Sequence, residues 1–426
     1  MSQSMLHSDV NDIPLEEYQE RVQRTQAKMA EESIDLLLAF ADSYRMSNVR
    51  WLANYRAFDG VFPYPAMVVL PVDGEPILLS EGSLLSYAKD CTWMSDVRGI
   101  RQSLRDILST FAATGSVEAD DAPPGTVRSS EPVKVAIAGY RYLTAEFLDI
   151  IRDTLTDPIE VVETGILDYM KSIKSEAEIR NLKIAGRLAD LGIEAIKQNA
   201  FEGVTERELA RAAYATMFAN GADTSSFDIM VQTGENSANY FLAHPTDRKL
   251  QRGDTILIDV GCRYNGYSSD MARSVTFGPV SEEAQRMVDT CLEAWQTGMK
   301  ALRPGMNGND ADIAGDDVVT AAGYIHAAGE GRGFAHGTGM DPEEEGPVIG
   351  PRSEWVLAEN QSFAFECTLL QPGIGGCRIE DVVILRAEGA ESLTNYPYVN
   401  NWDFVPRPDV FPVIPKLDPE HAVNSI

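Results

Sequence analysis

Two glutamates lie inside apolar, strand-like segments near the end of the chain, and this placement strongly constrains the fold. Glu366 lies within residues 361–370 and Glu380 within residues 376–385, and the neighbours of both are mostly apolar. Such runs are typical of buried β-strands. An ionised carboxylate there is costly unless it is paired with a cation or bound to a metal ion. We therefore expect a buried sheet whose carboxylates are paired with a cation or bound to a metal ion.

Three further candidate ligands precede these glutamates. Asp259 comes near the end of the apolar segment 255–260, and Asp270 follows eleven residues later, so two strands joined by a turn could pair as a hairpin and bring both acids together. His336 stands in the segment Phe-Ala-His-Gly-Thr-Gly. Four carboxylates and one imidazole suit two divalent ions (Mn, Fe, Co or Zn) with two carboxylates bridging. Taken singly, each acid could instead be a cap or turn residue, or be neutralised by a buried arginine.

Length and charge limit the class of protein. A chain of 426 residues favours two domains. The net charge of −29 would repel nucleic acid and anionic membranes, so we expect neither as a partner. The same acidity suits ordinary solubility or adaptation to high salt.

Cysteine usage and the N-terminal sequence indicate a cytoplasmic protein. The five cysteines are odd in number and form no Cys-x-x-Cys pair, which favours free thiols in a reducing compartment. The first residues lack a basic stretch followed by an apolar one, so we expect no signal peptide. No apolar run reaches the length of a membrane span.

The first half of the chain reads as a small α/β domain over residues 1–164. Apolar periodicity predicts helices at 13–31, 100–113 and 143–155, strands at 34–40, 64–72, 75–80 and 134–139, and an exposed loop at 114–133.

The second half, residues 165–426, reads as an α+β domain with a mostly antiparallel set of strands. The predicted helices are 175–198, 205–220, 281–302 and 310–322, and the predicted strands are 226–233, 255–260, 267–276, 361–370 and 376–385. Apolar residues recur every three or four positions on the helix 175–198, and a second apolar face suggests burial on two sides.

The ordered set Asp259, Asp270, His336, Glu366 and Glu380, with its local contexts, resembles the creatinase/prolidase/methionine aminopeptidase family, whose catalytic domain has the pita-bread fold. The resemblance covers roughly residues 166–385. An N-terminal α/β domain before the catalytic domain is similar to creatinase, prolidase and aminopeptidase P. The resemblance implies that Asp259 chelates one metal, that Asp270 and Glu380 bridge, and that His336 and Glu366 complete the other site.

The same resemblance suggests roles for further residues. Glu366 matches the family's general base or proton shuttle, and His244 matches a histidine that faces the substrate or leaving group. Arg378, two residues before Glu380 and thus on the same face of a strand, would orient a carboxylate or contact substrate; a simple ion pair is the alternative. Trp51 lies in a segment whose aromatic residues often reach an active site in this family, although a core role is the default expectation for it.

One departure from the family pattern concerns the residues after His336. Peptidases of this family usually place a second histidine shortly after this one, and here the acidic run from Asp341 to Glu345 follows instead. That run is either a solvated loop or a pocket wall that selects a cationic group. We expect a dinuclear metal-dependent hydrolase of a C–N bond, similar to Xaa-Pro dipeptidase or aminopeptidase and homodimeric by resemblance. The alternative is a lyase or amide hydrolase of a small zwitterion, such as dimethylsulfoniopropionate or ectoine.

Overall fold

The computed structural model describes residues 13–56, 62–115, 117, 133–156, 159–239, 244–325, 334–398 and 401–416. The chain divides into two compact units, Met1–Lys171 and Ser172–Ile426. The division falls at the end of helix α6 (Ile166–Ser172), a few residues beyond the expected boundary at residue 164. The predicted loop 114–133 lies almost wholly outside the described residues.

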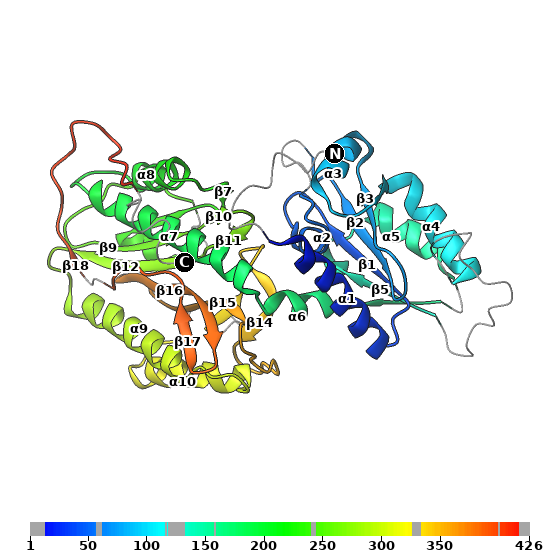
Figure 1. Ribbon diagram of the computed structural model, residues 1–426. Helices are drawn as coiled ribbons and strands as arrows, with labels where there is room; N and C mark the ends of the chain where they lie inside the picture. Colours follow the sequence, from blue (N-terminus) through cyan, green and yellow to red (C-terminus); the bar gives the residue numbers. More distant parts are fainter. Residues whose placement is uncertain are drawn as a thin grey trace. The chain divides into compact units, whose positions relative to one another are not determined.

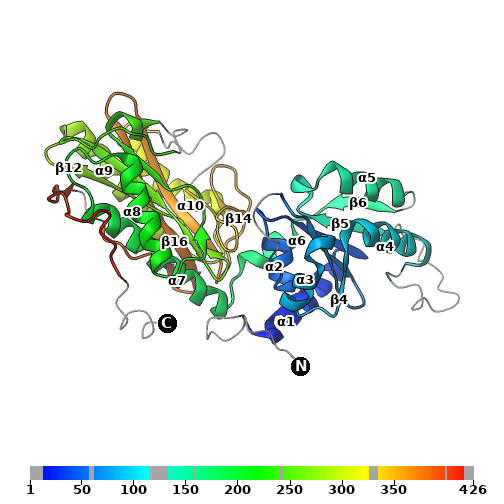
Figure 2. The same cartoon turned by 90° about the horizontal axis from the view of Figure 1, so that it is seen from above.

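Unit 1 is built on a six-stranded mixed sheet with the order β4-β3-β2-β1-β5-β6 (Figure 1). The central strands β1 and β2 are antiparallel, whereas β1 and β5 run parallel. Helices α4 and α5 lie against the sheet (Figure 2). They pack their apolar faces on it, with Leu104, Phe111 and Phe147 fully buried. The strands are β1 (Leu36–Ala41), β2 (Ala66–Pro71), β3 (Ile77–Ser80), β4 (Asp96–Gly99), β5 (Lys134–Ala138) and β6 (Glu160–Glu163). The helices before α6 are α1 (Leu15–Glu31), α2 (Ser47–Ala53), α3 (Leu85–Cys91), α4 (Ile100–Thr114) and α5 (Ala145–Thr154).

Unit 2 is organised around a large, mostly antiparallel sheet with the order β14-β13-β15-β16-β12-β9-β8. Strand β17 pairs with β16, and β18 pairs in parallel with β12. A smaller sheet has the order β11-β10-β7. The strands are β7 (Thr224–Ser225), β8 (Met230–Thr233), β9 (Thr255–Val260), β10 (Cys262–Tyr264), β11 (Tyr267–Ser268), β12 (Met271–Phe277), β13 (Ala335–Gly337), β14 (Glu344–Ile349), β15 (Ser362–Gln371), β16 (Gly375–Arg386), β17 (Gly389–Ser392) and β18 (Asn401–Trp402).

Four helices cover this sheet in two pairs, α7 with α8 and α9 with α10 (Figures 1 and 2). Both α7 and α8 begin with a capping box, formed by Ser175 with Glu178 and by Thr205 with Glu208. Each box satisfies backbone N–H groups that the first helical turn leaves without partners. The bounds are α7 (Glu176–Gln198), α8 (Glu206–Ala219), α9 (Glu282–Ala301) and α10 (Gly308–Ala321).

Strand alternation gives the large sheet two different faces. In β15, Phe363, Phe365 and Cys367 belong to the apolar core under α9 and α10, so the residues between them, including Glu366, project from the other face. The same alternation in β16 places Cys377 and Ile379 in that core and sends Glu380 to the face shared with Glu366. We call these the helix face and the site face.

Two predicted strands differ from the observed ones. The predicted strand 226–233 becomes regular only at Met230, where β8 begins. The predicted strand 267–276 is divided between β11 and β12 at Ser269 and Asp270. In the ranges that the structure describes, no helix combines the length and apolar character needed to span a membrane.

Candidate metal centre

Strand register brings the carboxylates from distant parts of the sequence together. Glu366 on β15 lies directly opposite Glu380 on β16. Ala272 on β12 pairs with Asp259 on β9 and also with Glu380. Asp270 comes immediately before β12, and the side chains of all four acids are buried. The hairpin expected for the two aspartates is therefore present, with β12 between β9 and β16.

Three of the five predicted ligands form one compact group. Ligand atoms of Asp270, His336 and Glu380 all lie within 4.8 Å of one another. His336 Nε2 is 3.8 Å from Asp270 Oδ2 and 3.8 Å from Glu380 Oε1. His336 is half-buried on β13, whereas both carboxylates are almost fully buried. A cation between these atoms would have one imidazole and two carboxylate ligands.

Asp259 and Glu366, the other two predicted ligands, are joined through Arg378. Arg378 Nη1 donates to Asp259 Oδ2 at 2.5 Å, and Arg378 Nε is 3.1 Å from Glu366 Oε2. Thr368 Oγ1 accepts from Arg378 Nε at 2.9 Å and lies 3.0 Å from Glu366 Oε2, to which it donates. Arg378 therefore contacts carboxylates, as its position two residues before Glu380 led us to expect.

The buried acids carry more negative charge than the protein groups around them neutralise. Among the described residues, Asp259 Oδ1 and Glu380 Oε2 are buried without a hydrogen-bond partner. Burial raises the pKa of Asp259 to about 6, although the Arg378 guanidinium opposes this rise. Burial also raises the pKa of Asp270 and of Glu380, and repulsion from nearby carboxylates adds to both shifts. Groups that resist ionising together, with free oxygens in the interior, fit a divalent cation that would compensate their charge.

The turn after His336 is fixed by a buried ion pair. Lys174 Nζ lies 2.9 Å from Glu344 Oε2, and Glu344 Oε1 accepts from the Met340 backbone N–H at 3.0 Å. A Cβ on Gly339 would come within 2.5 Å of Glu344 Oε1 and 2.7 Å of Lys174 Nζ, so a larger residue there would displace the pair. Ser268, two residues before Asp270, donates its backbone N–H to the Gly339 carbonyl at 2.7 Å. These contacts tie the His336 turn to the strand that leads to Asp270.

Besides Arg378, the predicted substrate residues are His244, Asp341 and Trp51. His244 is exposed, and its Nδ1 is 3.4 Å from Asp228 Oδ2. Asp341 is half-buried in the turn after β13, where its carbonyl accepts from the Gly339 N–H. Trp51 is fully buried in unit 1 beneath the Arg21 guanidinium, which lies 5.0 Å from its ring, so it packs as a core residue. The substrate roles of these residues stay predictions.

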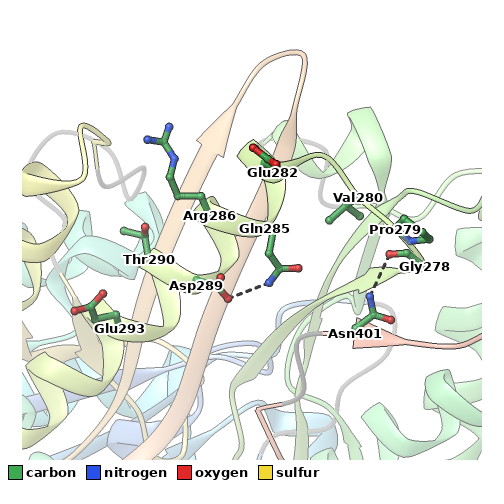
Figure 3. Close-up of a pocket in the computed structure, with 10 residues that line it drawn as sticks. All are labelled: Gly278, Pro279, Val280, Glu282, Gln285, Arg286, Asp289, Thr290, Glu293 and Asn401. Carbon is green, nitrogen blue, oxygen red and sulfur yellow. Dashed lines mark hydrogen bonds between the residues drawn. The ribbon is translucent and has the colours of Figure 1, made fainter.

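A hollow of about 630 Å³ opens elsewhere on unit 2. Figure 3 shows that it is lined by the first turns of α9 and by the residues after β12, with Gln285 donating to Asp289 and Asn401 to the Gly278 carbonyl. None of its lining residues is a predicted ligand. The described residues place no group of converging metal ligands in it. The carboxylate group on the site face is therefore the stronger candidate for chemistry.

The sequence reasoning missed the groups that hold the ligands in place. Thr368, Lys174 and Glu344 each make buried polar contacts next to the centre. Thr368 could have been found, because it lies two residues after Glu366 and alternation puts both on the site face. The Lys174–Glu344 pair joins residues 170 positions apart, and no local pattern predicts it.

Comparison with known proteins identifies the family. Residues 180–387 match the description Metallopeptidase family M24, and residues 21–133 match the Creatinase/Prolidase N-terminal domain. An uncharacterized peptidase of Staphylococcus haemolyticus is 34% identical over 263 residues, which cover 60% of this chain and 73% of the relative. The chain belongs to metallopeptidase family M24. An Xaa-Pro dipeptidase of Lactobacillus helveticus is 29% identical over 332 residues, covering 76% of this chain and 84% of the relative.

Solved structures agree with this assignment. An Xaa-Pro dipeptidase from Bacillus anthracis superposes with a TM-score of 0.75 at 25% identity, covering 90% of this chain and 99% of that one. The dipeptidase PepE from Mycobacterium ulcerans gives a TM-score of 0.77 at 25% identity, covering 92% and 99%. The predicted family, the two-domain α+β fold and the class of metal-dependent hydrolase acting on a peptide C–N bond are thereby confirmed. Nothing in these comparisons favours the lyase or zwitterion alternative.

Proposed function

We propose that this family member is an Xaa-Pro dipeptidase with two divalent ions, Mn, Fe, Co or Zn, held by Asp259, Asp270, His336, Glu366 and Glu380. The observation that carries the proposal is the group of Asp270, His336 and Glu380, whose ligand atoms converge within 4.8 Å beside buried carboxylate oxygens that have no hydrogen-bond partner among the described residues. The Xaa-Pro dipeptidases among its relatives and structural neighbours support the substrate class.

Each ligand has a distinct place in this proposal. Asp270 and Glu380 are central, because both lie within reach of His336 and the Asp270 charge raises the pKa of Glu380. Asp259 and Glu366 lie on either side of Arg378. We assign Asp270 and Glu380 as the bridging carboxylates, with Asp259 on one ion and His336 and Glu366 on the other.

The residues around the ions would prepare the reaction. Divalent ions, when bound, would activate a water molecule and polarise the scissile carbonyl. Glu366 would hold the proton that this water gives up and deliver it to the leaving nitrogen. Thr368 and Arg378 fix the Glu366 carboxylate through contacts of 3.0 and 3.1 Å. Arg378 also restrains Asp259, and a charge-assisted contact of this kind keeps a ligand oriented before substrate binds.

We assign His244 and Asp341 to the substrate side. His244 is exposed and therefore open to a ligand, with Asp228 close enough to orient its ring. The turn that follows His336 carries glutamates where peptidases of this family usually have a second histidine. Loss of one hydrogen-bond donor to a developing oxyanion costs about 10²–10³ in turnover. We expect Xaa-Pro cleavage that is slower than in ordinary prolidases.

We also propose a cytoplasmic homodimer. The cysteines support a reducing compartment, because all those that the structure describes are free thiols. Light scattering at working concentration should give a mass near twice the 46.7 kDa of the chain. A single species of chain mass would refute the dimer.

The metal assignment is tested by removing ligands one at a time. Asp270→Ala should lose both ions, since this carboxylate is assigned as a bridge, whereas His336→Ala should weaken mainly one site. Metal content is measured by elemental analysis after gel filtration, with a thermal melt to establish that each variant is folded. Full metal content in the Asp270→Ala protein would end the dinuclear assignment.

A further inference from the structure

A buried network lies on the helix face of the large sheet, directly behind the metal centre. Arg273 and Asp381 follow Ala272 and Glu380, the residues that pair across β12 and β16. Alternation sends their side chains away from the site face. Both are almost completely buried, and Arg273 Nη2 contacts Asp381 Oδ1 at 2.7 Å.

Arg273 bonds to the backbone of the strands that carry the ligands. Its Nη1 donates to the Glu380 carbonyl at 2.8 Å and to the Ala272 carbonyl at 2.9 Å. Strands β12 and β16 share a single register pair, Ala272 with Glu380. Beyond it, the Ser274 hydroxyl on β12 accepts a hydrogen bond from the Arg378 backbone N–H on β16 at 2.8 Å. Side chains of β12 thus complete an irregular junction between strands that hold Asp270 and Glu380.

Asp381 is fixed by the segment that follows β17. Tyr398 Oη donates to Asp381 Oδ2 at 2.6 Å, and Thr394 Oγ1 donates to Asp381 Oδ1 at 2.5 Å. The Tyr396 carbonyl accepts from Arg273 Nε at 3.1 Å and Nη2 at 2.8 Å. The Arg273 guanidinium also stacks on the Tyr398 ring, 4.3 Å from its centroid. Residues 394–398 therefore satisfy both members of the buried ion pair.

We propose that Arg273, Asp381 and Tyr398 are positioning residues, through which residues 394–398 set the affinity of the metal centre. The proposal rests on the metal assignment made above. A buried charge pair keeps one geometry only when its remaining hydrogen bonds are satisfied. Here Asp381 is one residue from Glu380, and Arg273 holds the Glu380 backbone. Loss of the Tyr398 hydroxyl would loosen the pair and, with it, the orientation of the Glu380 carboxylate.

The test compares two tyrosines of the same segment. Tyr398→Phe removes one hydroxyl but keeps the ring that stacks on Arg273. Tyr396→Phe is the matched control, because its hydroxyl donates to Glu194 on α7 at 2.9 Å and its backbone carbonyl, which serves Arg273, is unchanged. Both substitutions delete one hydrogen bond from a tyrosine to an acid. Mn²⁺ affinity is measured by calorimetric titration of the metal-stripped full chain, and Co²⁺ absorption reports ligand geometry.

We expect Tyr398→Phe to weaken Mn²⁺ binding about tenfold, the lower end of the range for residues that orient metal ligands, and to change the Co²⁺ spectrum. The Tyr396→Phe protein should keep the parent's Mn²⁺ affinity and Co²⁺ spectrum, although it should lose about as much thermal stability as the Tyr398→Phe protein. Equal effects of the two substitutions, or no change for Tyr398→Phe, would overturn the positioning role while leaving the metal centre intact. If the unsubstituted chain itself binds none of Mn²⁺, Fe²⁺, Co²⁺ and Zn²⁺, the metal assignment and this inference both fall.

Discussion

Breaking the buried Lys174–Glu344 pair should destabilise unit 2 strongly. The two side chains are only 1% and 2% exposed, and their charged atoms are 2.9 Å apart. Lys174→Met leaves the Glu344 carboxylate buried with the Met340 N–H as a neutral donor in place of a cation. Glu344→Gln leaves an ammonium group facing a neutral amide. Removing one partner of such a pair costs about 3–5 kcal/mol, because the other charge stays buried after losing its counter-ion.

The double variant separates the pair's own contribution from the cost of isolating a charge. Replacing both members by groups of similar volume is often close to neutral. Lys174→Met combined with Glu344→Gln should therefore cost about 2 kcal/mol or less, far below the sum of the single effects. The amide that the Glu344→Gln substitution introduces would still offer an oxygen to the Met340 N–H, so the turn after His336 should keep its main anchor.

Urea unfolding of the three variants and the parent, each metal-stripped at pH 7.5, gives the free energies of this cycle. Tryptophan fluorescence is a suitable probe, since Trp295 is buried in the core of unit 2. Single-variant losses below about 1 kcal/mol, of the size found for exposed ion pairs, would refute the reasoning. Strictly additive losses would refute it as well, because they would mean that the two charges do not depend on each other.

Three further predictions follow from individual residues. Burial raises the pKa of Asp312 from 3.8 to about 6. Because this pKa rises on folding, the folded protein loses stability as the pH rises through this window. Asp312→Asn keeps an acceptor for the Phe334 N–H and should add at most about 3 kcal/mol to the free energy of unfolding at pH 8 and nothing at pH 3, as urea midpoints would reveal. His244→Ala should reduce turnover with unchanged metal content; parent-like turnover would remove His244 from the site. Gly339→Ala should lower metal retention, because its Cβ would meet both Lys174 and Glu344; parent-like retention would show that the turn adapts.

The sequence predicts the site-bearing strands well because their signals are local. The expected segment 255–260 coincides with β9 (Thr255–Val260), and the two long C-terminal strands differ from expectation by one residue at each end. Apolar runs interrupted by a single acid leave few alternatives for a buried sheet. The same alternation places Arg378 on the face of Glu380, and its contacts with the carboxylates follow from that.

Short and irregular elements escape such reasoning. Strand β13, which carries His336, has only three residues, and its pairing with β14 shifts register. Asp270 lies between strands β11 and β12, and the alternating pattern of the sequence predicts one continuous strand there instead of two. The Arg273–Asp381 pair joins residues 108 positions apart. Contacts of this kind depend on tertiary packing, which local propensity does not encode.

The most direct test of the dinuclear centre measures metal content and Xaa-Pro dipeptide hydrolysis on the same sample, before stripping with a chelator, after it, and after reloading with Mn²⁺. We predict two ions per chain, loss of hydrolysis with the ions, and its return as both sites refill. Hydrolysis that persists at the original rate in metal-free protein, or that is complete with one ion per chain, would contradict the dinuclear centre.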